Sequence, residues 1–294
     1  MKLSIITINY NNAEGLRKTL ASVAVQTYSS IEHIIIDGGS TDGSIEVIKD
    51  YIAKVESQEP RAKSVIWSSE KDNGVYHAMN KGIKKATGEY IQILNSGDIL
   101  AAPDVTERMM NALHSLNINS LNITENVPIL YGNMLKSYDG KTIINRDTCG
   151  NRMYTPESFL YFYNGTLNHD CAYIRRDLFD KYGLYNEDMK ICSDWEWYVK
   201  TIVLGGEKPV YTNIDVTIFD MNGISESGGK NKELIKKERR EYLEKILPPT
   251  VLHDYDQFSF PVLQYQRLKK YHLWGLVYFL ERVLFKLEKW RILR

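Results

Sequence analysis

The first hundred residues alternate short apolar runs with stretches of helical spacing, and this alternation restricts the possible folds more than any other feature of the sequence. Four apolar runs, each read as a strand, lie at residues 3–8, 33–36, 65–67 and 90–94. Helical spacing of apolar residues separates them at residues 14–26, 44–54 and 75–86. Consecutive strands that are apolar on both faces and alternate with helices form a parallel sheet covered on each side. We therefore expect an α/β fold that binds its ligands at the carboxyl ends of the strands.

The second half of the chain has a mixed pattern. Residues 129–136 and 142–146, joined by Tyr138-Asp139-Gly140-Lys141, are typical of a hairpin on an Asp-Gly turn. The remaining expected elements are a helix after Pro103, helices at residues 176–181 and 194–204, and strands at 210–213 and 216–219. Because no linker is visible before about residue 245, we expect one large domain up to that point.

Charge is balanced over the whole chain but not along it. The 294 residues contain 37 Lys+Arg and 37 Asp+Glu, with 43% hydrophobic residues, which excludes a disordered chain. Residues 265–294 nevertheless carry a net charge of +6 and the rest of the chain −6. This contrast predicts that the C-terminal segment has a partner of its own.

The N-terminus and the cysteines indicate a cytoplasmic protein. Met1-Lys2 leads directly into the first apolar run, without the apolar core and cleavage site of a secretory leader. The three cysteines are widely spaced and form no C-x-x-C pair, so we expect reduced thiols and neither a disulfide framework nor a zinc site. No uncharged apolar stretch approaches the roughly 20 residues that span a bilayer.

Three polar loops follow the expected strands. They are Asp37–Ser44, Glu70–Gly82 and Asn95–Asp98. A carboxylate at the end of a buried strand, such as Asp37, is placed to accept hydrogen bonds from a base or ribose. Asp98 is placed to hold a phosphate-bound cation, since Mg²⁺ needs only one or two protein carboxylates beside phosphates and water. His77 and Lys81 are expected on the surface. The absence of G-x-G-x-x-G and P-loop motifs argues against a dinucleotide dehydrogenase and a P-loop kinase.

In order and spacing, several segments resemble the family-two inverting glycosyltransferases, which have a GT-A nucleotide-sugar-binding domain. The segments with this similarity are residues 5–12, 36–44, 72–82, 86–90 and 94–98, and more weakly 169–170, 175–179 and 193–197. The resemblance implies a GT-A catalytic domain at 1–245. Beyond about residue 245 the resemblance ends, and the charge and apolar spacing predict a basic, amphipathic helical tail at 246–294. Within the domain, residues 1–105 would bind the nucleotide sugar and residues 106–225 would form the acceptor side.

The resemblance also implies which residues bind the donor. These are Thr7, Asn9 and Tyr10 around the nucleotide, Asp37 at the base edge, Asp72 and Gly74 near the ribose and donor sugar, and Asn95. Asp98 would hold the divalent cation, Mn²⁺ or Mg²⁺, that bridges the diphosphate. The family's Asp-x-Asp motif is incomplete, because the positions before Asp98 are Asn95, Ser96 and Gly97. We therefore expect weak metal affinity.

The catalytic base of the family maps onto Asp194, with Glu196 as the competing candidate. Two positions apart on a helix, the two carboxylates point about 200° apart, so only one is expected to act as the base. The acceptor-side residues implied by the resemblance are His169, Asp170, Trp195 and Glu196. Trp195 and Trp197 fit a buried core as well as a sugar-binding surface.

The function implied is transfer of a hexose or N-acetylhexosamine from a UDP-sugar to a glycan, by a single displacement that inverts the anomeric carbon. The acceptor would be lipid-linked, as in bacterial surface polysaccharide synthesis. A glycosidase is disfavoured, because the metal and nucleotide residues precede the base by nearly a hundred positions. A nucleotidyltransferase is also disfavoured, because it would need a Gly-rich, basic first loop and residues 11–15 do not form one. A nucleotide-sugar-binding protein without turnover remains the alternative, supported by the missing acids beside Asp98.

The tail has an apolar face interleaved with basic residues. Leu276, Leu280, Val283, Leu284 and Leu287 recur with helical spacing. We expect this face to lie on an anionic membrane surface at the inner side of the plasma membrane, where each Lys or Arg gains about 1 kcal/mol. The alternative is packing on the catalytic domain or on a second copy of the chain. Nucleic-acid binding is not expected, given the acidic body.

Overall fold

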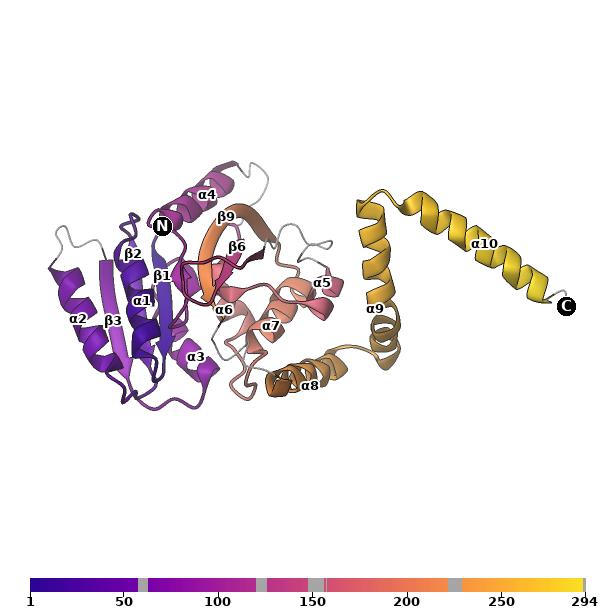
Figure 1. Ribbon diagram of the computed structural model, residues 1–294. Helices are drawn as coiled ribbons and strands as arrows, with labels where there is room; N and C mark the ends of the chain where they lie inside the picture. Colours follow the sequence, from indigo (N-terminus) through magenta and orange to yellow (C-terminus); the bar gives the residue numbers. More distant parts are fainter. Residues whose placement is uncertain (58–62, 120–125, 148–155, 157, 222–228, 293–294) are drawn as a thin grey trace. The chain divides into compact units, whose positions relative to one another are not determined.

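The computed structural model describes residues 1–57, 63–119, 126–147, 156, 158–221 and 229–292 (Figure 1). The chain divides into two compact units, Met1–Tyr242 and Leu243–Arg294. The first unit contains the sheet and all the residues predicted to carry chemistry.

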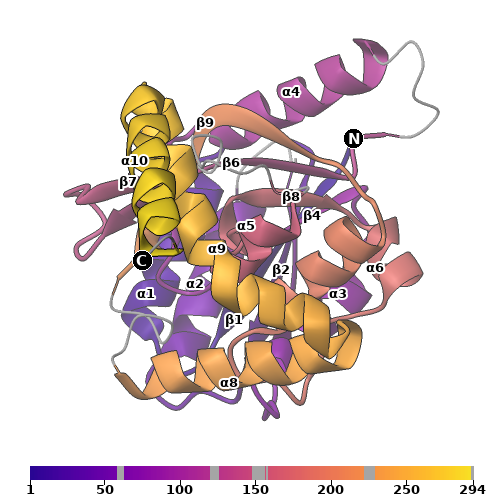
Figure 2. The same ribbon diagram turned by 90° about the vertical axis from the view of Figure 1, so that its right-hand side faces the viewer.

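The sheet of the first unit has nine strands among the described residues. Their order is β3-β2-β1-β4-β8-β6-β9-β5, with β7 paired to β6. The strands are β1 (Leu3–Asn9), β2 (Ile31–Asp37), β3 (Lys63–Ser69), β4 (Tyr90–Ile93), β5 (Ile99–Leu100), β6 (Ile129–Ser137), β7 (Asn145–Asp147), β8 (Ala172–Arg175) and β9 (Pro209–Asp220). The first four pair in parallel, which confirms the expected α/β fold, and beyond β4 the pairing is mixed, with β8 antiparallel to both β4 and β6 (Figure 2).

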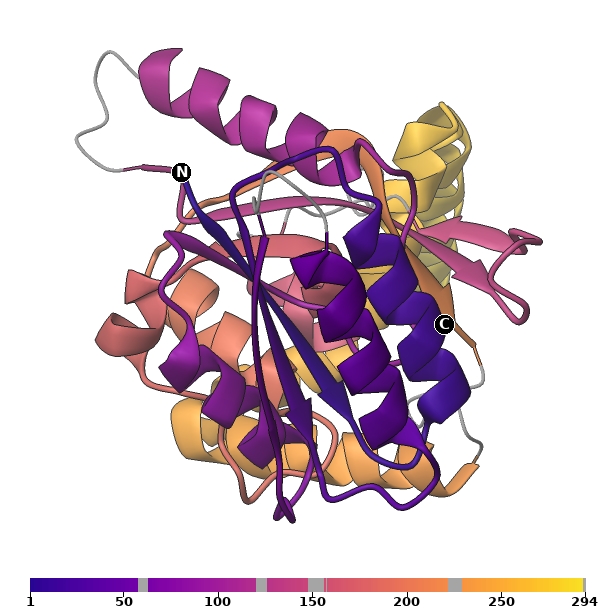
Figure 3. The same ribbon diagram turned by 90° about the vertical axis from the view of Figure 1, so that its left-hand side faces the viewer.

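Helices cover both faces of the parallel part. Helices α1 (Ala13–Ala24) and α2 (Ser44–Glu56) pack side by side on one face, whereas α3 (Val75–Lys85) packs against β1 and β2 from the other (Figure 3). Beneath α1 and α2, the buried side chains of Leu16, Leu20, Ile35, Val47 and Tyr51 belong to one apolar cluster. The 3.6-residue spacing in the helices and the fully buried strands explain why this half can be predicted locally.

The second half of the first unit contains helices and turns of varied length. They are α4 (Val105–Asn119), α5 (Phe159–Asn164), the 3₁₀ turn η2 (His169–Cys171), α6 (Asp177–Tyr182), α7 (Ser193–Tyr198), the π-helical turn η3 (Val199–Leu204) and α8 (Gly229–Ile246), which continues past the unit boundary. The helix expected at 194–204 is thus α7 followed by a π-helical turn. The two strands expected near 210 and 216 form one strand, because shifts in its register with β6 absorb the irregularity between them.

The expected hairpin is present in β6 and β7. Its turn is fixed by Asp139, whose carboxylate accepts hydrogen bonds from the backbone N–H groups of Lys141 and Thr142 at 2.8 and 2.7 Å. Gly140 has a φ of 74°, the left-handed conformation that favours glycine.

The order of the parallel strands reverses between β1 and β4. From β1 the chain moves outward to β2 and β3, and it then crosses back to place β4 on the other side of β1. Such a reversal leaves a crevice at the carboxyl ends of the two neighbouring strands, which is where α/β sheets bind ligands. Asn9 ends β1, and Asn95 follows β4 closely.

The second unit contains α9 (Pro249–Lys270) and α10 (Trp274–Ile292). Large apolar side chains of α10 are exposed around much of its surface: Leu276, Tyr278, Phe279, Leu280, Val283, Leu284, Phe285 and Leu287. Among the described residues, neither these helices nor any other combines the length and the hydropathy of a membrane span.

Candidate functional site

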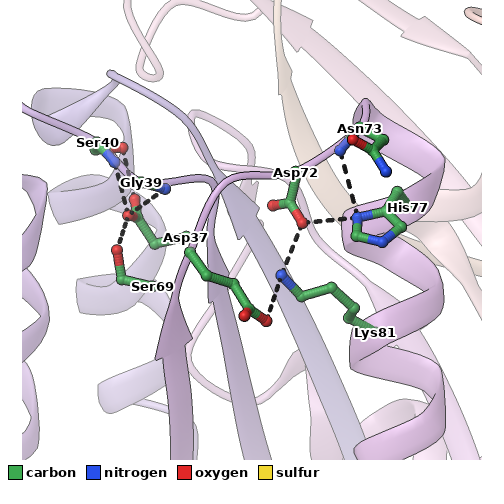
Figure 4. Close-up of polar contacts among 9 residues, drawn as sticks. Asp37, Gly39, Ser40, Ser69, Asp72, Asn73, His77 and Lys81 are labelled. Atoms are coloured by element: carbon green, nitrogen blue, oxygen red, sulfur yellow. Dashed lines mark hydrogen bonds and ion pairs between the residues drawn. The ribbon is translucent and has the colours of Figure 1, made fainter.

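Asp37, at the end of β2, holds the loop that follows it. Its buried carboxylate accepts hydrogen bonds from the hydroxyls of Ser40 and Ser69, both at 2.6 Å, and from the backbone N–H groups of Gly39 and Ser40 at 3.1 and 2.9 Å (Figure 4). The side-chain Nδ2 of Asn9 also donates to it, at 2.8 Å. Burial opposes ionisation of Asp37, but the hydrogen bonds from Ser40, Ser69 and Asn9 outweigh it and keep the pKa of Asp37 below its usual value. Asn9 and Asp37 are thereby fixed as one unit at the ends of adjacent strands.

Thr7 lies inside the protein. Its hydroxyl is 2.9 Å from Nε2 of His33, and Nδ1 of the same ring is 2.8 Å from the hydroxyl of Tyr51. All three side chains are buried. Thr7 therefore supports β1 from within, and its predicted contact with the nucleotide stays a prediction.

Asp72 occupies the loop between β3 and α3. Its Oδ1 atom accepts from Lys81 Nζ at 2.7 Å and lies 3.0 Å from His77 Nδ1 (Figure 4). Lys81 is partly exposed, at 14%, because its ammonium group pairs with Asp72 at 2.7 Å and with Glu70 at 2.9 Å. Gly74 begins the turn into α3 with a φ of 134°, which few other residues adopt.

The second carboxylate oxygen of Asp72 lies close to the backbone of Gly38. Among the described residues, Asp72 Oδ2 is buried and has no hydrogen-bond partner. A Cβ atom on Gly38 would lie 3.4 Å from this oxygen and 3.1 Å from Cδ2 of Tyr10, whose side chain is 68% exposed. The unpaired Oδ2 of Asp72, the backbone of Gly38 and the exposed ring of Tyr10 thus lie together at the ends of β1 and β2.

The loop after β4 is held by α1. The Thr19 hydroxyl donates to the backbone carbonyl of Asp98 at 2.7 Å and accepts from the N–H of Gly97 at 3.0 Å. Asn12, which caps α1, donates from Nδ2 to the carbonyl of Ser96 at 3.1 Å. Gly97 has a φ of 112°. These contacts fix the backbone that presents Asp98.

Asp98 is surrounded by acidic residues from distant parts of the chain. Its Oδ1 atom accepts from the backbone N–H of Asp220 at 2.9 Å. Burial and the charges of Asp170 and Asp220 raise the pKa of Asp98 well above its usual value. Burial also raises the pKa of Asp170, whose Oδ2 accepts from Thr217 Oγ1 at 3.0 Å. The negative charge near Asp98 therefore comes from Asp170 and Asp220, which are distant in the sequence, and not from the positions immediately before Asp98.

The residues around Asp98 fit a hard divalent cation that is shared with a substrate. Buried carboxylate oxygens are the ligands Mg²⁺ and Mn²⁺ prefer, and a cation would relieve the repulsion that raises the pKa of Asp98. Among the residues the structure describes, no three His, Cys, Asp or Glu side chains form a complete metal site. Phosphate and water ligands would have to complete the coordination.

Asp194, near the start of α7, lies at the centre of a second group. Its Oδ2 is 3.1 Å from Nδ1 of His169 and its Oδ1 is 3.0 Å from the hydroxyl of Tyr76. Its side chain is 14% exposed. Burial opposes ionisation of Asp194, but the hydrogen bonds and the charge of His169 prevail and keep the pKa of Asp194 below its usual value. The carboxylate is thus ionised at neutral pH.

His169 connects Asp194 with the loop after β4. The Nε2 atom of His169 lies 3.2 Å from the side-chain nitrogen of Asn95. Burial disfavours protonation of this ring, but its hydrogen bond to Asp194 and the charges of Asp194, Asp170 and Asp98 raise the pKa of His169 to about 9. A protonated ring carries positive charge beside the carboxylates of the site, and its Nε2–H then requires the amide oxygen of Asn95, not its nitrogen, as the acceptor.

The residues next to Asp194 on α7 are packed differently. Glu196 Oε2 accepts from Asn186 Nδ2 at 3.1 Å. Trp195 is 1% exposed, and its indole N–H donates to the carbonyl of Phe162 at 2.8 Å. The indole N–H of Trp197 donates to the backbone carbonyl of Gly183, also at 2.8 Å. This burial supports the core alternative for both tryptophans, and an acceptor contact by Trp195 stays a prediction.

Two residues of this region carried no predicted role. Tyr76 belongs to the segment 72–82 that resembles the family, but nothing in the local pattern indicates that its hydroxyl reaches Asp194. Asp220 ends β9 without any motif, and its placement beside Asp98 depends on how β9 joins the sheet.

Comparison with known proteins agrees with this geometry. Residues 4–183 match the family described as Glycosyl transferase family 2. An uncharacterized glycosyltransferase of Mycobacterium tuberculosis is 31% identical over 225 residues, which cover 76% of each chain. The PGL/p-HBAD biosynthesis glycosyltransferase of Mycobacterium bovis is 25% identical over 237 residues, covering 80% of this chain and 81% of that protein.

Solved structures share the fold at low sequence identity. TarS 1-349 of S. aureus in complex with UDP-GlcNAc has a TM-score of 0.58 and 19% identity, with 83% of this chain and 67% of that chain covered. The mannosyltransferase PcManGT from Pyrobaculum calidifontis, in complex with GDP-Man and Mn²⁺, has a TM-score of 0.60 and 15% identity, with 96% and 80% covered. The match spans only 36% of the longer TarS chain.

The chain has a GT-A-like fold, as these solved structures do. The chain belongs to glycosyl transferase family 2.

Proposed function

We propose that this glycosyltransferase transfers a hexose or N-acetylhexosamine from a UDP-sugar to a glycan acceptor by a single inverting displacement, with Asp194 as the general base. The observation that carries the proposal is the geometry around the Asp194 carboxylate, which lies 3.1 Å from His169 Nδ1 and 3.0 Å from the Tyr76 hydroxyl. Through Asn95, His169 also joins it to the loop that presents Asp98.

The reaction needs a base on the acceptor side of the anomeric carbon. The acceptor hydroxyl attacks this carbon while the nucleoside diphosphate leaves from the opposite face, and Asp194 takes the hydroxyl proton. A positioned carboxylate of this kind contributes about 10²- to 10⁴-fold to the rate. Asp194 suits the task because two hydrogen bonds fix its orientation and its lowered pKa keeps it ionised.

The donor nucleoside is proposed to bind between Tyr10, Gly38 and Asp72. The exposed Tyr10 ring offers a stacking surface, and Asp72 Oδ2 offers an unused acceptor for an N–H or hydroxyl of the nucleoside. Complexes of TarS with UDP and UDP-GlcNAc support a uridine donor, whereas PcManGT was solved with GDP-Man.

Asp98 is proposed to hold Mn²⁺ or Mg²⁺ together with the donor diphosphate. When bound, such an ion neutralises the charge that develops on the leaving diphosphate. Asp98 supplies a carboxylate oxygen, and Asp170 and Asp220 add negative charge nearby. The Mn²⁺ in the PcManGT structure supports this assignment.

The two units are proposed to have separate roles. The sheet-containing unit binds donor and acceptor, and the basic tail attaches the enzyme to an anionic membrane surface that carries a lipid-linked acceptor. The support is the set of exposed apolar side chains on α10 combined with the +6 charge of residues 265–294. We propose that the enzyme works at the inner face of the plasma membrane.

Nucleotide release tests the proposed activity. The full-length protein is incubated with UDP- and GDP-linked hexoses and N-acetylhexosamines, Mn²⁺ and a lipid-linked glycan, and the released diphosphate and the glycan mass are measured. We expect UDP release coupled to a mass increase of one sugar, and neither with Asp194→Asn. Tight binding of a UDP-sugar without turnover under all these conditions would favour the non-catalytic alternative.

A further inference from the structure

The segment that leads into α7 is held by a carboxylate from outside the region that matches the family. Glu238, on α8, accepts hydrogen bonds from three consecutive backbone N–H groups. Its Oε1 lies 2.6 Å from the nitrogen of Lys190, and its Oε2 lies 3.1 and 3.0 Å from the nitrogens of Ile191 and Cys192. The side chain of Glu238 is buried, with 7% exposure. Charge-assisted bonds to three successive amides fix both the position and the direction of this backbone.

The fixed peptides lie directly beside the proposed base. Cys192 precedes α7, in which Asp194 is the second residue. The Ile191 carbonyl lies 2.6 Å from the Tyr76 hydroxyl, which is also within 3.0 Å of Asp194 Oδ1. Glu238 thus accepts from the N–H of Ile191, and Tyr76 donates to its carbonyl. Both contacts hold the backbone that leads to Asp194.

A second contact from α8 reaches the residue after the base. The guanidinium of Arg239 lies 4.9 Å from the centre of a Trp195 ring, and the ring of Tyr242 meets Trp195 edge-on at 5.8 Å. Trp195 is also held by its hydrogen bond to the carbonyl of Phe162. Residues 190–192 and Trp195, which lie on the two sides of Asp194 in the sequence, thus both contact α8.

We propose that Glu238 is a positioning residue for catalysis: it sets the location of Asp194 through the backbone of residues 190–192. This inference rests on the proposed role of Asp194 as general base. Glu238 itself touches no reacting group. A displacement of a catalytic group on the order of 1 Å can lower the rate about a hundredfold. Because the Glu238 anchor sets the position of Asp194, its loss should lower turnover more than it weakens donor binding.

The test compares Glu238→Gln with Glu241→Gln in the full-length enzyme. Glutamine keeps one acceptor oxygen but places an N–H₂ donor at the other position, so it loses the negative charge and at least one of the three hydrogen bonds with almost no change in volume. Glu241 is the matched control, since it lies on the same helix, is 55% exposed and pairs only at 3.8 Å with Lys237. We expect Glu238→Gln to lower kcat about 10- to 100-fold, with the donor KM and the UDP affinity within about twofold of wild type. Glu241→Gln should match wild type.

Hydrogen exchange and a double-mutant cycle separate positioning from general destabilisation. Exchange of the amides of residues 190–192 should accelerate in Glu238→Gln, while the amides of β1 and β2 keep their protection. In an Asp194→Asn background, Glu238→Gln should lower the remaining rate little further, because its effect passes through Asp194. An equal loss in both backgrounds, or an unchanged kcat in Glu238→Gln, would overturn the proposal.

Two further outcomes are distinguishable. If Asp194→Asn has wild-type activity, the base assignment is wrong, and the role of Glu238 is wrong with it. If Asp194→Asn is inactive but Glu238→Gln is fully active, only the positioning role is wrong. Should Glu238→Gln fail to fold, Glu238→Asp carries the test: its carboxylate is one methylene too short to reach all three amides, so we expect reduced kcat with unchanged UDP affinity. Wild-type kcat in this variant would also overturn the proposal.

Discussion

Tyr76 and Asp194 are 118 positions apart in the sequence, yet the hydroxyl of Tyr76 lies 3.0 Å from Oδ1 of Asp194. Tyr76 is on the first turn of α3, directly after the loop that carries Asp72. The segment proposed to bind the donor and the residue proposed to activate the acceptor are therefore in direct contact. We expect this contact to couple donor binding to the position of the base.

Replacing Tyr76 by Phe should change the pH dependence of the reaction. The Tyr76 hydroxyl helps to lower the pKa of Asp194, after the larger effects of burial, which raises it, and of His169, which lowers it. Tyr76→Phe therefore raises the pKa of Asp194. Because a base is active when ionised, activity is lost as the pH falls through this pKa, and the acid limb of the kcat/KM profile moves to higher pH. Because the wild-type pKa of Asp194 lies below the usual aspartate value of about 3.9, profiles that extend from about pH 2.5 to 8 measure the shift.

Tyr185→Phe is the control for this shift. The Tyr185 ring lies near Tyr76, but its buried hydroxyl has no hydrogen-bond partner among the described residues. Its removal should leave the acid limb in place. An acid limb that moves equally in both variants would contradict the assignment.

Asp194→Asn should lower turnover at least about a hundredfold, because general-base catalysis contributes 10²- to 10⁴-fold. UDP affinity, measured by calorimetry, should stay nearly unchanged. Glu196→Gln is the matched variant on the same helix, where the carboxylate bonds to Asn186 instead of His169, and it should retain most of the activity. The reverse result would identify Glu196 as the base.

Asp98→Ala should remove the effect of Mn²⁺ or Mg²⁺ on UDP binding, together with activity, because Asp98 is the proposed protein ligand of the cation. Titration calorimetry of UDP with and without the metal measures the first effect. Asp104→Ala, an exposed carboxylate in a nearby segment, serves as the control. Full activity of the wild-type enzyme in EDTA would contradict the cation site.

The tail should bind anionic vesicles. Full-length protein is expected to sediment with phosphatidylserine or phosphatidylglycerol vesicles and to be released by high salt, since each Lys or Arg near the surface gains about 1 kcal/mol. Leu280→Glu/Leu284→Glu, which places charge on the apolar face, should remain in the supernatant with unchanged transferase activity on a water-soluble acceptor. Binding by this double variant equal to wild type, or loss of its oligomeric state, would point to a packing role for α10 instead.

Much of the first half of the fold follows from local sequence alone. The strands β1 to β4 and the helices between them were predicted within a few residues of their observed bounds. The reason is that an apolar run for a buried strand and a 3.6-residue apolar period for a helix are both visible in each segment's own sequence. The loops that carry Asp37, Asp72 and Asp98 follow from the same pattern, since strand ends in parallel sheets face one edge. The Asp194 assignment depended on resemblance and still awaits its experiment.

The contacts of the site were decided only by the tertiary structure. Asp220 approaches Asp98 across 122 positions, and Glu238 reaches Cys192 across 46. Nothing near Asp220 or Glu238 in the sequence distinguishes them from other acidic residues at a strand end or on a charged helix. The order of strands brings such residues together, and that order is fixed by burial summed over the whole sheet. Sequence therefore determined which segments form strands and helices, whereas the three-dimensional packing decided which of their side chains act on one another.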